Sequence, residues 1–504
     1  MAAILGWVFF IVALLLTVYG VNALLLTLIF LYKRIAGKNR NPRQNTPDIS
    51  WPDVTVQLPI YNENAVVRRL IDSAARLDYP LDRLTIQVLD DSTDDTTQQA
   101  AEQVEYWRSR RRNISLIHRA ERSEYKAGNL KNGMESDHSE FLAIFDADFI
   151  PPSDWLKRAL EPFFGPDGGS IGMVQTRWVH LNESQSPLTR AQALLFDGHF
   201  GIEQRVRSEE GLFFGFNGSA GIWRRRCIEE SGGWRGEMLS EDLDLSYRAQ
   251  LNGWKFRYLP DVVAPAEVPP TMTAFKIQQF RWAKGSMQAV RNHVPRILKA
   301  PVSWWKKWHG LLHISGFLVH PLMVLMVLLS LPLALAGPQA LKEVPMAWLG
   351  IGALGTPLLF PVAEWSLYPK QAWWKRALWL PLMIILGTGV AVSNTKAVIT
   401  GLLNIHSPFH RTPRQGDIPA GKDAVRAAQV SAKVDAITWL EIAFAVLSFL
   451  IVVIDIRYGN WINAIYLAVF SAGFAWVAFS TLRETFCPLL VKLLSAKAVD
   501  APIE

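Results

Sequence analysis

Residues 141–148 (FLAIFDAD) decide the fold class of this chain. The apolar run 141–145 predicts a buried strand, and Asp146 and Asp148 follow where that strand would end. Two carboxylates at positions i and i+2 past a buried strand can hold a divalent cation against a diphosphate. A solvated turn after a strand is the alternative, because Asp-x-Asp also occurs by chance in loops.

The composition indicates a globular domain combined with membrane helices. The chain has 504 residues, of which 50% are hydrophobic, and it contains 20 Trp. Its formal charge is +7, but Lys and Arg cluster beside apolar segments, which favours membrane-flanking charge over a nucleic-acid surface. Cys227 and Cys487 provide neither a disulfide framework nor a zinc spacing, which fits an active domain in the reducing cytoplasm.

Residues 1–33 are predicted to be a transmembrane anchor. The uncharged stretch 4–31 exceeds the roughly 20 residues needed to cross a bilayer, and Lys33 and Arg34 follow it. Basic residues after the apolar segment place its end inside and the N-terminus outside. A cleaved signal peptide would carry its positive charge before a shorter apolar core, so we expect the mature protein to keep this segment.

The rest of the chain divides by hydropathy. Residues 50–300 alternate β-rich runs with helix-compatible segments, which predicts a cytosolic α/β domain of the Rossmann type. The Trp- and Lys-rich residues 301–309 predict an interfacial helix. Two transmembrane helices are expected in 310–367 and two more in 436–482, with a cytosolic tail over 483–504.

Residues 373–435 are predicted to form an interfacial helix and a cytosolic loop. If every apolar segment spanned the bilayer, the basic loop 404–435 would lie outside, against the positive-inside tendency. The segment 377–403 follows a Trp-Trp-Lys-Arg cluster and has a polar second half, so we assign it to the interface. Five spans result.

Polar residues follow the first two predicted strands of the α/β domain. Residues 54–63 are expected to form a strand that runs into a loop, where a nucleotide base could bind. The strand 84–89 ends in an acidic run, in which Asp90 or Asp91 could accept hydrogen bonds from a base or ribose. The alternative is a helix N-cap cluster, and the two interpretations are compatible.

Further charged residues could take part in group transfer. Lys126 could contact a diphosphate or a carboxylate, or it could be a surface lysine. Asp146 and Asp148 offer hard oxygen ligands to Mg²⁺ or Mn²⁺. Glu241 and Asp242 offer a general base, or merely first-turn acids of a helix.

A final motif, Gln278-x-x-Arg281-Trp282, completes an ordered series that chance rarely supplies. With it, the chain resembles the processive family 2 glycosyltransferases, the group of cellulose, chitin and hyaluronan synthases. The similarity is strongest to the plant cellulose synthase-like A and C proteins, and it covers residues 52–282 and the architecture of the membrane region. The runs that carry it are VLDDSTD (88–94), YKAG (125–128), AIFDADF (143–149) and FFGFNGSAG (213–221).

The resemblance implies a GT-A fold, with Asp242 as the general base and the cation at Asp146 and Asp148. The residues it assigns to the nucleotide sugar are Pro59, Tyr61, Glu63, Asp90, Lys126 and Asp146. The residues it assigns to the acceptor are Phe214, Asn217, Ser219, Glu241, Gln278, Arg281 and Trp282. Phe409, Thr412 and Arg414 lie where bacterial cellulose synthases have a gating loop, although Arg414 replaces its Lys.

The function expected from this resemblance is inverting transfer of a hexose from UDP-glucose or GDP-mannose to a growing β-linked glucan or mannan, which the enzyme would extrude. The motifs do not distinguish the sugar. The alternatives are a non-processive enzyme that acts on a lipid acceptor, a non-catalytic export subunit and a transporter. The protein would reside in the plasma or inner membrane, or in the Golgi of a eukaryote, with its catalytic domain in the cytoplasm.

Overall fold

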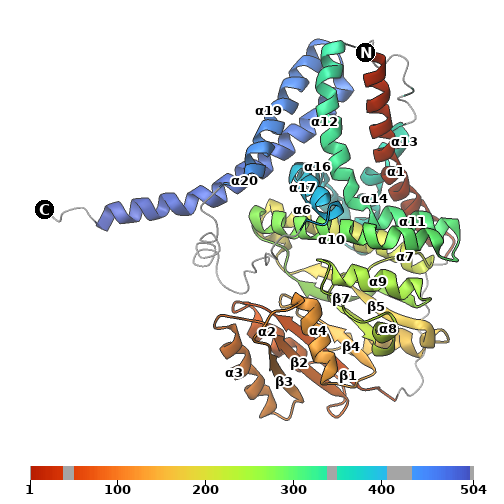
Figure 1. Ribbon diagram of the computed structural model, residues 1–504, viewed down its shortest axis with the longest axis vertical. Coiled ribbons are helices and arrows are strands. Elements are labelled where there is room, and N and C mark those ends of the chain that lie inside the picture. The colour runs from red at the N-terminus through yellow and green to blue at the C-terminus, as the bar shows by residue number, and fades with distance from the viewer. Residues whose placement is uncertain (1, 38–49, 338–344, 346–348, 406–433, 500–504) are drawn as a thin grey trace.

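The computed structural model describes residues 2–37, 50–337, 345, 349–405 and 434–499, with side chains up to 486. An α/β domain is built around one sheet, and a group of long helices rises from one side of it (Figure 1).

The sheet has seven strands in the order β3-β2-β1-β4-β6-β5-β7. Their bounds are Val54–Ile60 (β1), Leu84–Asp90 (β2), Ile114–His118 (β3), Phe141–Ile144 (β4), Ile171–His180 (β5), Gly221–Arg224 (β6) and Lys255–Ala266 (β7). Strands β1 to β4 pair in parallel, whereas β6 runs antiparallel to both β4 and β5. The three strands predicted at residues 54, 84 and 141 are confirmed.

Helices cover both faces of the sheet. One face packs against α2, α3 and α5, and the other against α4, α8 and α9. The helices of this domain are α2 (Val67–Ala75), α3 (Thr96–Arg108), α4 (Tyr125–Glu135), α5 (Trp155–Leu160), α6 (Pro187–Gly198), α7 (Gln204–Glu209), α8 (Arg225–Glu230), α9 (Glu241–Leu251) and α10 (Met272–Lys299). A five-residue π-helical turn, η4 (His199–Glu203), joins α6 to α7.

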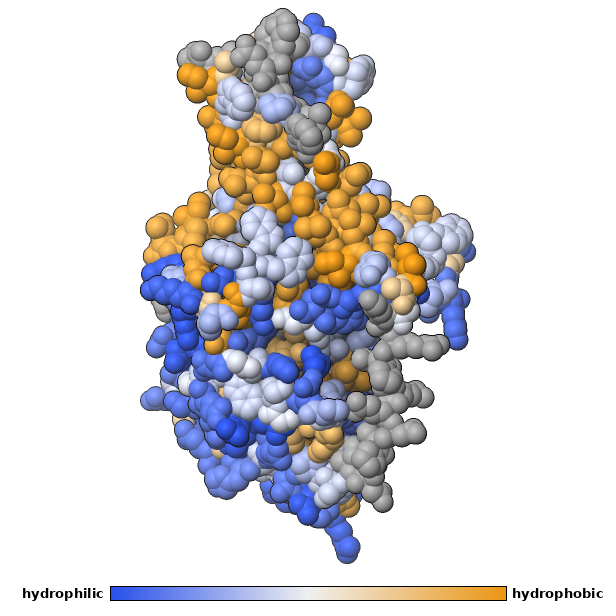
Figure 2. Space-filling model, turned by 90° about the vertical axis from the view of Figure 1, so that its right-hand side faces the viewer, coloured by the Kyte–Doolittle hydropathy of each residue, from blue (hydrophilic) through white to orange (hydrophobic). Residues whose placement is uncertain are grey.

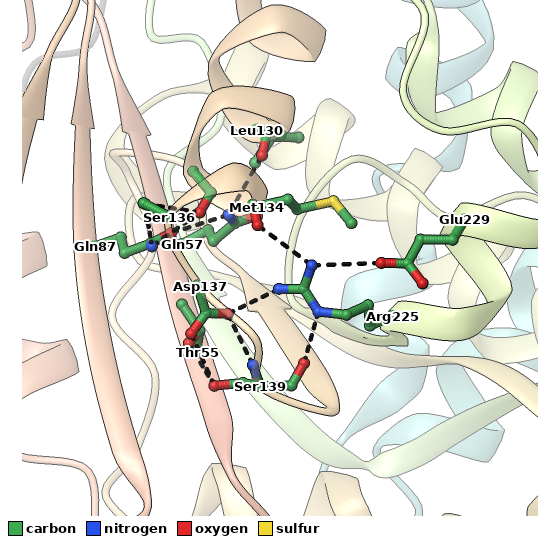
Figure 3. Close-up of polar contacts among 11 residues, drawn as sticks. Thr55, Gln57, Gln87, Leu130, Met134, Ser136, Asp137, Ser139, Arg225 and Glu229 are labelled. Atoms are coloured by element: carbon green, nitrogen blue, oxygen red, sulfur yellow. Dashed lines mark hydrogen bonds and ion pairs between the residues drawn. The ribbon is translucent and has the colours of Figure 1, made fainter.

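A buried polar network holds the end of α4 on the central strands (Figure 3). Gln57 of β1 donates to Gln87 of β2 at 3.1 Å, and Gln87 donates to the carbonyl of Gly133 in α4 at 2.9 Å. Arg225 of α8 binds Asp137, just after α4, at 2.9 Å. A buried polar group without a partner costs about 1–3 kcal/mol, so these bonds fix α4 against the sheet. Lys126 lies at the other end of that helix.

The helices beyond residue 300, together with the N-terminal helix, form the second part of the molecule. They are α1 (Ala2–Ile35), α11 (Trp304–Ile314), α12 (Val319–Ala336), α13 (Leu349–Ala353), α14 (Gly355–Leu367), α15 (Trp373–Ala377), α16 (Leu380–Gly389), α17 (Ala391–Leu402), α19 (Ala436–Arg457) and α20 (Trp461–Val499). Helices α10 and α11 lie crosswise between the α/β domain and the long helices (Figure 1).

Four described helices are long and apolar enough to cross a membrane, namely Ala3–Ile35, Gly316–Ala336, Ala436–Arg457 and Trp461–Phe486. Apolar residues cover the surface of the long helices, and polar residues cover most of the α/β domain (Figure 2). Exposed Trp304, Trp305 and Trp308 lie on α11, which is the pattern expected of an interfacial helix.

Two segments differ from the simplest expectation. The second of the two spans expected in 310–367 is divided into the short helices α13 and α14, with Pro361 inside α14. The segment we assigned to the interface forms a helix pair, Trp373–Gly389 and Ala391–Leu402, bent by 45°. By length and composition this pair qualifies as a fifth span, so its interfacial placement stays a prediction.

Candidate active site

The carboxyl ends of β1, β2 and β4 open into one cavity of about 180 Å³, which α9 and α10 close from the membrane side. The sequence-predicted residues that line it are Pro59, Tyr61, Glu63, Lys126, Asp146, Asp148, Asn217, Glu241, Asp242, Gln278, Arg281 and Trp282. Residues more than 200 positions apart in the chain therefore meet at one place.

Asp90 and Asp91, in the acidic run at the end of β2, have different surroundings. Asp90 does not line the cavity, because its fully buried carboxylate accepts hydrogen bonds from the Ser92 backbone N–H at 2.9 Å and the Thr97 hydroxyl at 2.6 Å. Although burial favours the neutral form, these bonds and His118 hold the pKa of Asp90 below its usual range. Asp91 lines the cavity instead. Of the two residues that the sequence offers for a nucleotide contact, Asp91 is therefore the one in the cavity wall.

Lys126 connects the Asp146 turn to a second loop. Its ammonium group donates to the Asp146 carboxylate and to the carbonyl oxygen of Gly218, the latter at 2.7 Å. Burial opposes the charge of Lys126, but Asp146 and Glu241 outweigh it and raise the pKa of Lys126. Lys126 is therefore a retained positive charge inside the cavity, not the surface lysine of the alternative interpretation.

Asp146 and Asp148 both line the cavity. The backbone N–H of Asp146 donates to the hydroxyl of Ser219 at 2.9 Å, which fixes the turn against the loop before β6. No group of three or more His, Cys, Asp or Glu side chains that could hold a metal is found among the described residues. Two carboxylates fit a divalent cation whose remaining ligands are diphosphate oxygens and water.

Asp242 lies in the first turn of α9, within the same cavity. Burial, and then the adjacent Glu241 carboxylate, raise the pKa of Asp242 to about 7. Burial also raises the pKa of Glu241, against the attraction of Lys126. A carboxylate that titrates near neutral pH can take a proton from an acceptor hydroxyl, as a general base must.

The backbone packs closely around Asp242. Gly218 has φ +83°, and a Cβ there would lie 2.8 Å from Oδ2 of Asp242. On the other side a Cβ at Gly285 of α10 would lie 2.8 Å from the Cβ of Ser240. Glycine is thus required at both positions for α10 and the Gly218 loop to approach the base.

The acceptor residues are only partly as expected. Gln278, Arg281 and Trp282 of α10 line the cavity together with Asn217. Phe214 and Ser219, which the resemblance also assigns to the acceptor, do not line this cavity.

Phe214 is 1% exposed and packs in the core beside Phe256, and Ser219 is fully buried with its hydroxyl engaged by Asp146. Both side chains point into the protein and hold the loop before β6 in place. Phe409, Thr412 and Arg414, the predicted gating residues, lie outside the described residues.

Several cavity residues were missed by sequence reasoning. The Arg122 guanidinium lies 3.4 Å from the centre of the Tyr61 ring, which places a cation at the end of the cavity formed by the residues after β1. Phe196 of α6 meets Trp282 edge-on with ring centroids 5.9 Å apart, and it also packs against Trp178 of β5. No motif marks these residues, and only the general enrichment of aromatic side chains at sugar sites would have suggested them.

A second cavity, of about 580 Å³, continues from the first toward the membrane helices. Residues that line both are Trp178, Phe196, Asn217, Ser240, Asp242 and Trp282. The second cavity extends between α1, α6, α10 and α12, where Tyr19, Asn22 and His320 line it. Asp242 therefore stands at the junction of the two spaces.

Comparison with known proteins identifies the family. A model described as glycosyltransferase like family 2 matches residues 52–285. The chain is 35% identical over 448 residues to glucomannan 4-beta-mannosyltransferase 2 of Arabidopsis thaliana, covering 85% of this chain and 81% of that protein. The chain belongs to glycosyltransferase family 2. Its α/β domain is accordingly a GT-A domain with a mixed sheet, and the protein is a transferase.

The chain is also similar to a second plant protein and to a solved structure. The glycosyltransferase is 38% identical over 371 residues to probable glucomannan 4-beta-mannosyltransferase 7 of Oryza sativa subsp. japonica, covering 70% of this chain and 60% of that one. Among solved structures, a mannosyltransferase from Pyrobaculum calidifontis in complex with GDP-Man and Mn²⁺ matches with a TM-score of 0.47 and 21% identity. That match covers 72% of this chain and all of the other.

Proposed function

We propose that this glycosyltransferase transfers mannosyl groups from GDP-mannose to the end of a β-1,4-linked mannan or glucomannan, with inversion at the anomeric carbon. The observation that carries the proposal is Asp242, a carboxylate titrating near pH 7, in one cavity with Asp146 and Asp148. Mannose as the transferred sugar is supported by the plant relatives, which are named for it. The sequence motifs alone left UDP-glucose equally open.

The reaction is a single displacement. The acceptor hydroxyl attacks the anomeric carbon of the donor while Asp242 takes its proton, so the new C–O bond forms as the bond to the diphosphate breaks. The nucleoside diphosphate leaves with the bonding electron pair, and no covalent enzyme intermediate is needed. Lys126 faces the leaving diphosphate and contributes a fixed positive charge.

Asp146 and Asp148 would hold a divalent cation, Mg²⁺ or Mn²⁺. When bound, such an ion neutralises charge on the diphosphate and so stabilises the leaving group. Lys126 orients the Asp146 carboxylate by its direct contact.

Processive synthesis is supported by the second cavity. An acceptor whose end lies at Asp242 has to extend away from the donor. The second cavity provides that direction, and its mostly apolar wall also carries the polar side chains of Asn22, His199 and Gln279. We infer that the growing chain enters this cavity and leaves across the bilayer.

The test uses the full-length protein in detergent or nanodiscs with GDP-mannose, UDP-glucose, GDP-glucose or UDP-N-acetylglucosamine and either Mg²⁺ or Mn²⁺. Linkage analysis of the product should give β-1,4-mannosyl units from GDP-mannose. Transfer only from UDP-glucose would overturn the donor assignment. A product that remains a single sugar on lipid would overturn the polymer acceptor.

A further inference from the structure

The π-helical turn η4 lies in the wall of the second cavity and breaks the regular helix between α6 and α7. Such turns add a residue to one helical turn and are frequent at functional sites because they redirect side chains. Here the turn separates two faces with different surroundings.

One face of the turn is fixed by membrane helices. Ile202 is fully buried in a cluster with Leu26 of α1 and Leu359 of α14. At Gly201 a Cβ would lie 3.1 Å from the Cβ of Ala363 in α14. The backbone of the turn is therefore held in place by tight packing.

The opposite face presents His199 and Glu203 to the cavity. Nδ1 of His199 lies 3.1 Å from Oε2 of Glu203, and its Nε2 lies 3.3 Å from Oδ1 of Asn217. Asn217 lines both cavities and precedes Gly218, which touches Asp242. His199 is thus placed one side chain beyond the catalytic junction, on its membrane side.

Glu203 has a structural partner as well. Its Oε1 accepts from Arg207, which is 1% exposed and also donates to the carbonyl of His309 at 3.1 Å. Its other oxygen faces His199. A carboxylate anchored in this way fixes the orientation of the imidazole ring, as carboxylate partners of histidine commonly do.

We propose that His199, oriented by Glu203 through Nδ1, binds a hydroxyl group of the sugar next to the terminal residue of the acceptor chain, and that its Nε2 exchanges the 3.3 Å contact with Asn217 for this hydroxyl. The inference rests on the proposed function and names a subsite of it. An acceptor whose last hydroxyl is at Asp242 passes Asn217 first and His199 next. Imidazole and amide groups supply the hydrogen bonds, and Trp282 and Phe196 supply aromatic surface in the same cavity. His199 is a binding residue and Glu203 a positioning residue.

The experiment compares acceptors of different length. The full-length enzyme and its His199→Ala variant are assayed with the donor that wild type uses, against a monosaccharide and a tetrasaccharide acceptor. His199→Ala should raise KM for the tetrasaccharide about tenfold more than KM for the monosaccharide, the effect of one lost hydrogen bond. His138→Gln, on an exposed loop, is the matched control and should leave both values unchanged.

Glu203 is tested through its coupling to His199. Because Glu203 acts through the imidazole, Glu203→Gln added to His199→Ala should increase the KM ratio no further than His199→Ala alone. Additive effects would assign Glu203 to Arg207 alone and overturn its positioning role. An equal change of KM for both acceptors would overturn the subsite. Absence of any transfer by wild type would instead contradict the proposed function.

Discussion

The Lys126 ammonium group donates to the carbonyl oxygen of Gly218 at 2.7 Å while it also contacts the Asp146 carboxylate. One side chain thus joins the turn that faces the donor to the loop that faces the acceptor. Gly218 in turn lies against Asp242. The charge that we propose stabilises the leaving diphosphate therefore also lowers the pKa of Asp242, the proposed general base.

Replacing Lys126 should have two effects. In Lys126→Met we expect KM for the donor to rise at least tenfold, because a charge-assisted bond near the diphosphate is lost. Burial and Glu241 raise the pKa of Asp242, and Lys126 limits that rise, so the acidic midpoint of the pH profile should also move upward. Lys131→Met, on the exposed side of α4, is the control. An unchanged midpoint would separate Lys126 from the base.

Asp242→Asn should lower kcat by a factor of about 10²–10⁴, the usual contribution of a general base. Nucleotide binding, measured by calorimetry with GDP, should stay close to that of wild type because Asp242 is not a ligand of the diphosphate. Asp82→Asn, at an exposed carboxylate, should behave like wild type. Retained turnover in Asp242→Asn would move the base to another residue.

Activity should rise with pH through about 7. The pKa of Asp242 is raised above its ordinary value, so below pH 7 the carboxyl is protonated and cannot accept the proton of the hydroxyl. The profile of kcat/KM should increase tenfold per pH unit below the midpoint and level off above it. A flat profile between pH 5.5 and 8 would contradict this role.

Removal of divalent cations should abolish transfer, and Mg²⁺ or Mn²⁺ should restore it. Asp148→Asn should weaken this restoration, raising the cation concentration for half-maximal activity about tenfold or more, because a charged ligand becomes neutral. Titration of GDP binding against cation concentration gives a readout independent of turnover. Full activity in the presence of a chelator would exclude the proposed cation.

The acceptor helix α10 is held by membrane helices, which leads to a prediction on stability. Glu484 of α20 accepts from the backbone N–H groups of Met272 and Thr273 at 2.6 and 2.9 Å, at the N-terminus of α10. Removing a helix cap costs about 0.5–2 kcal/mol. Glu484→Ala should lower Tm and raise KM for the acceptor while KM for the donor changes little. Glu230→Ala, at an exposed helix end, should change neither Michaelis constant.

The sequence predicted much of this protein because its signals are local. The short runs of β-branched and apolar residues at 54, 84 and 141 predicted strands, and the structure has strands at those places. The parallel order of these strands gathers their carboxyl ends at one edge, so Tyr61 and Asp146 could be assigned to one cavity in advance. The family followed from the order of the same motifs.

Only the tertiary structure decided which neighbour in each motif faces the cavity. Asp90 ends β2 and Asp91 follows it, and both are buried. Of the two, Asp91 lines the cavity, whereas the Asp90 carboxylate is bonded to Ser92 and Thr97. Phe214, in the loop before β6, packs in the core beside Phe256. His199 belongs to no motif, because its position depends on a π turn held by α1 and α14, which are far apart in the sequence. Contacts between residues so far apart in the sequence depend on how the helices pack, and a local sequence motif does not record them.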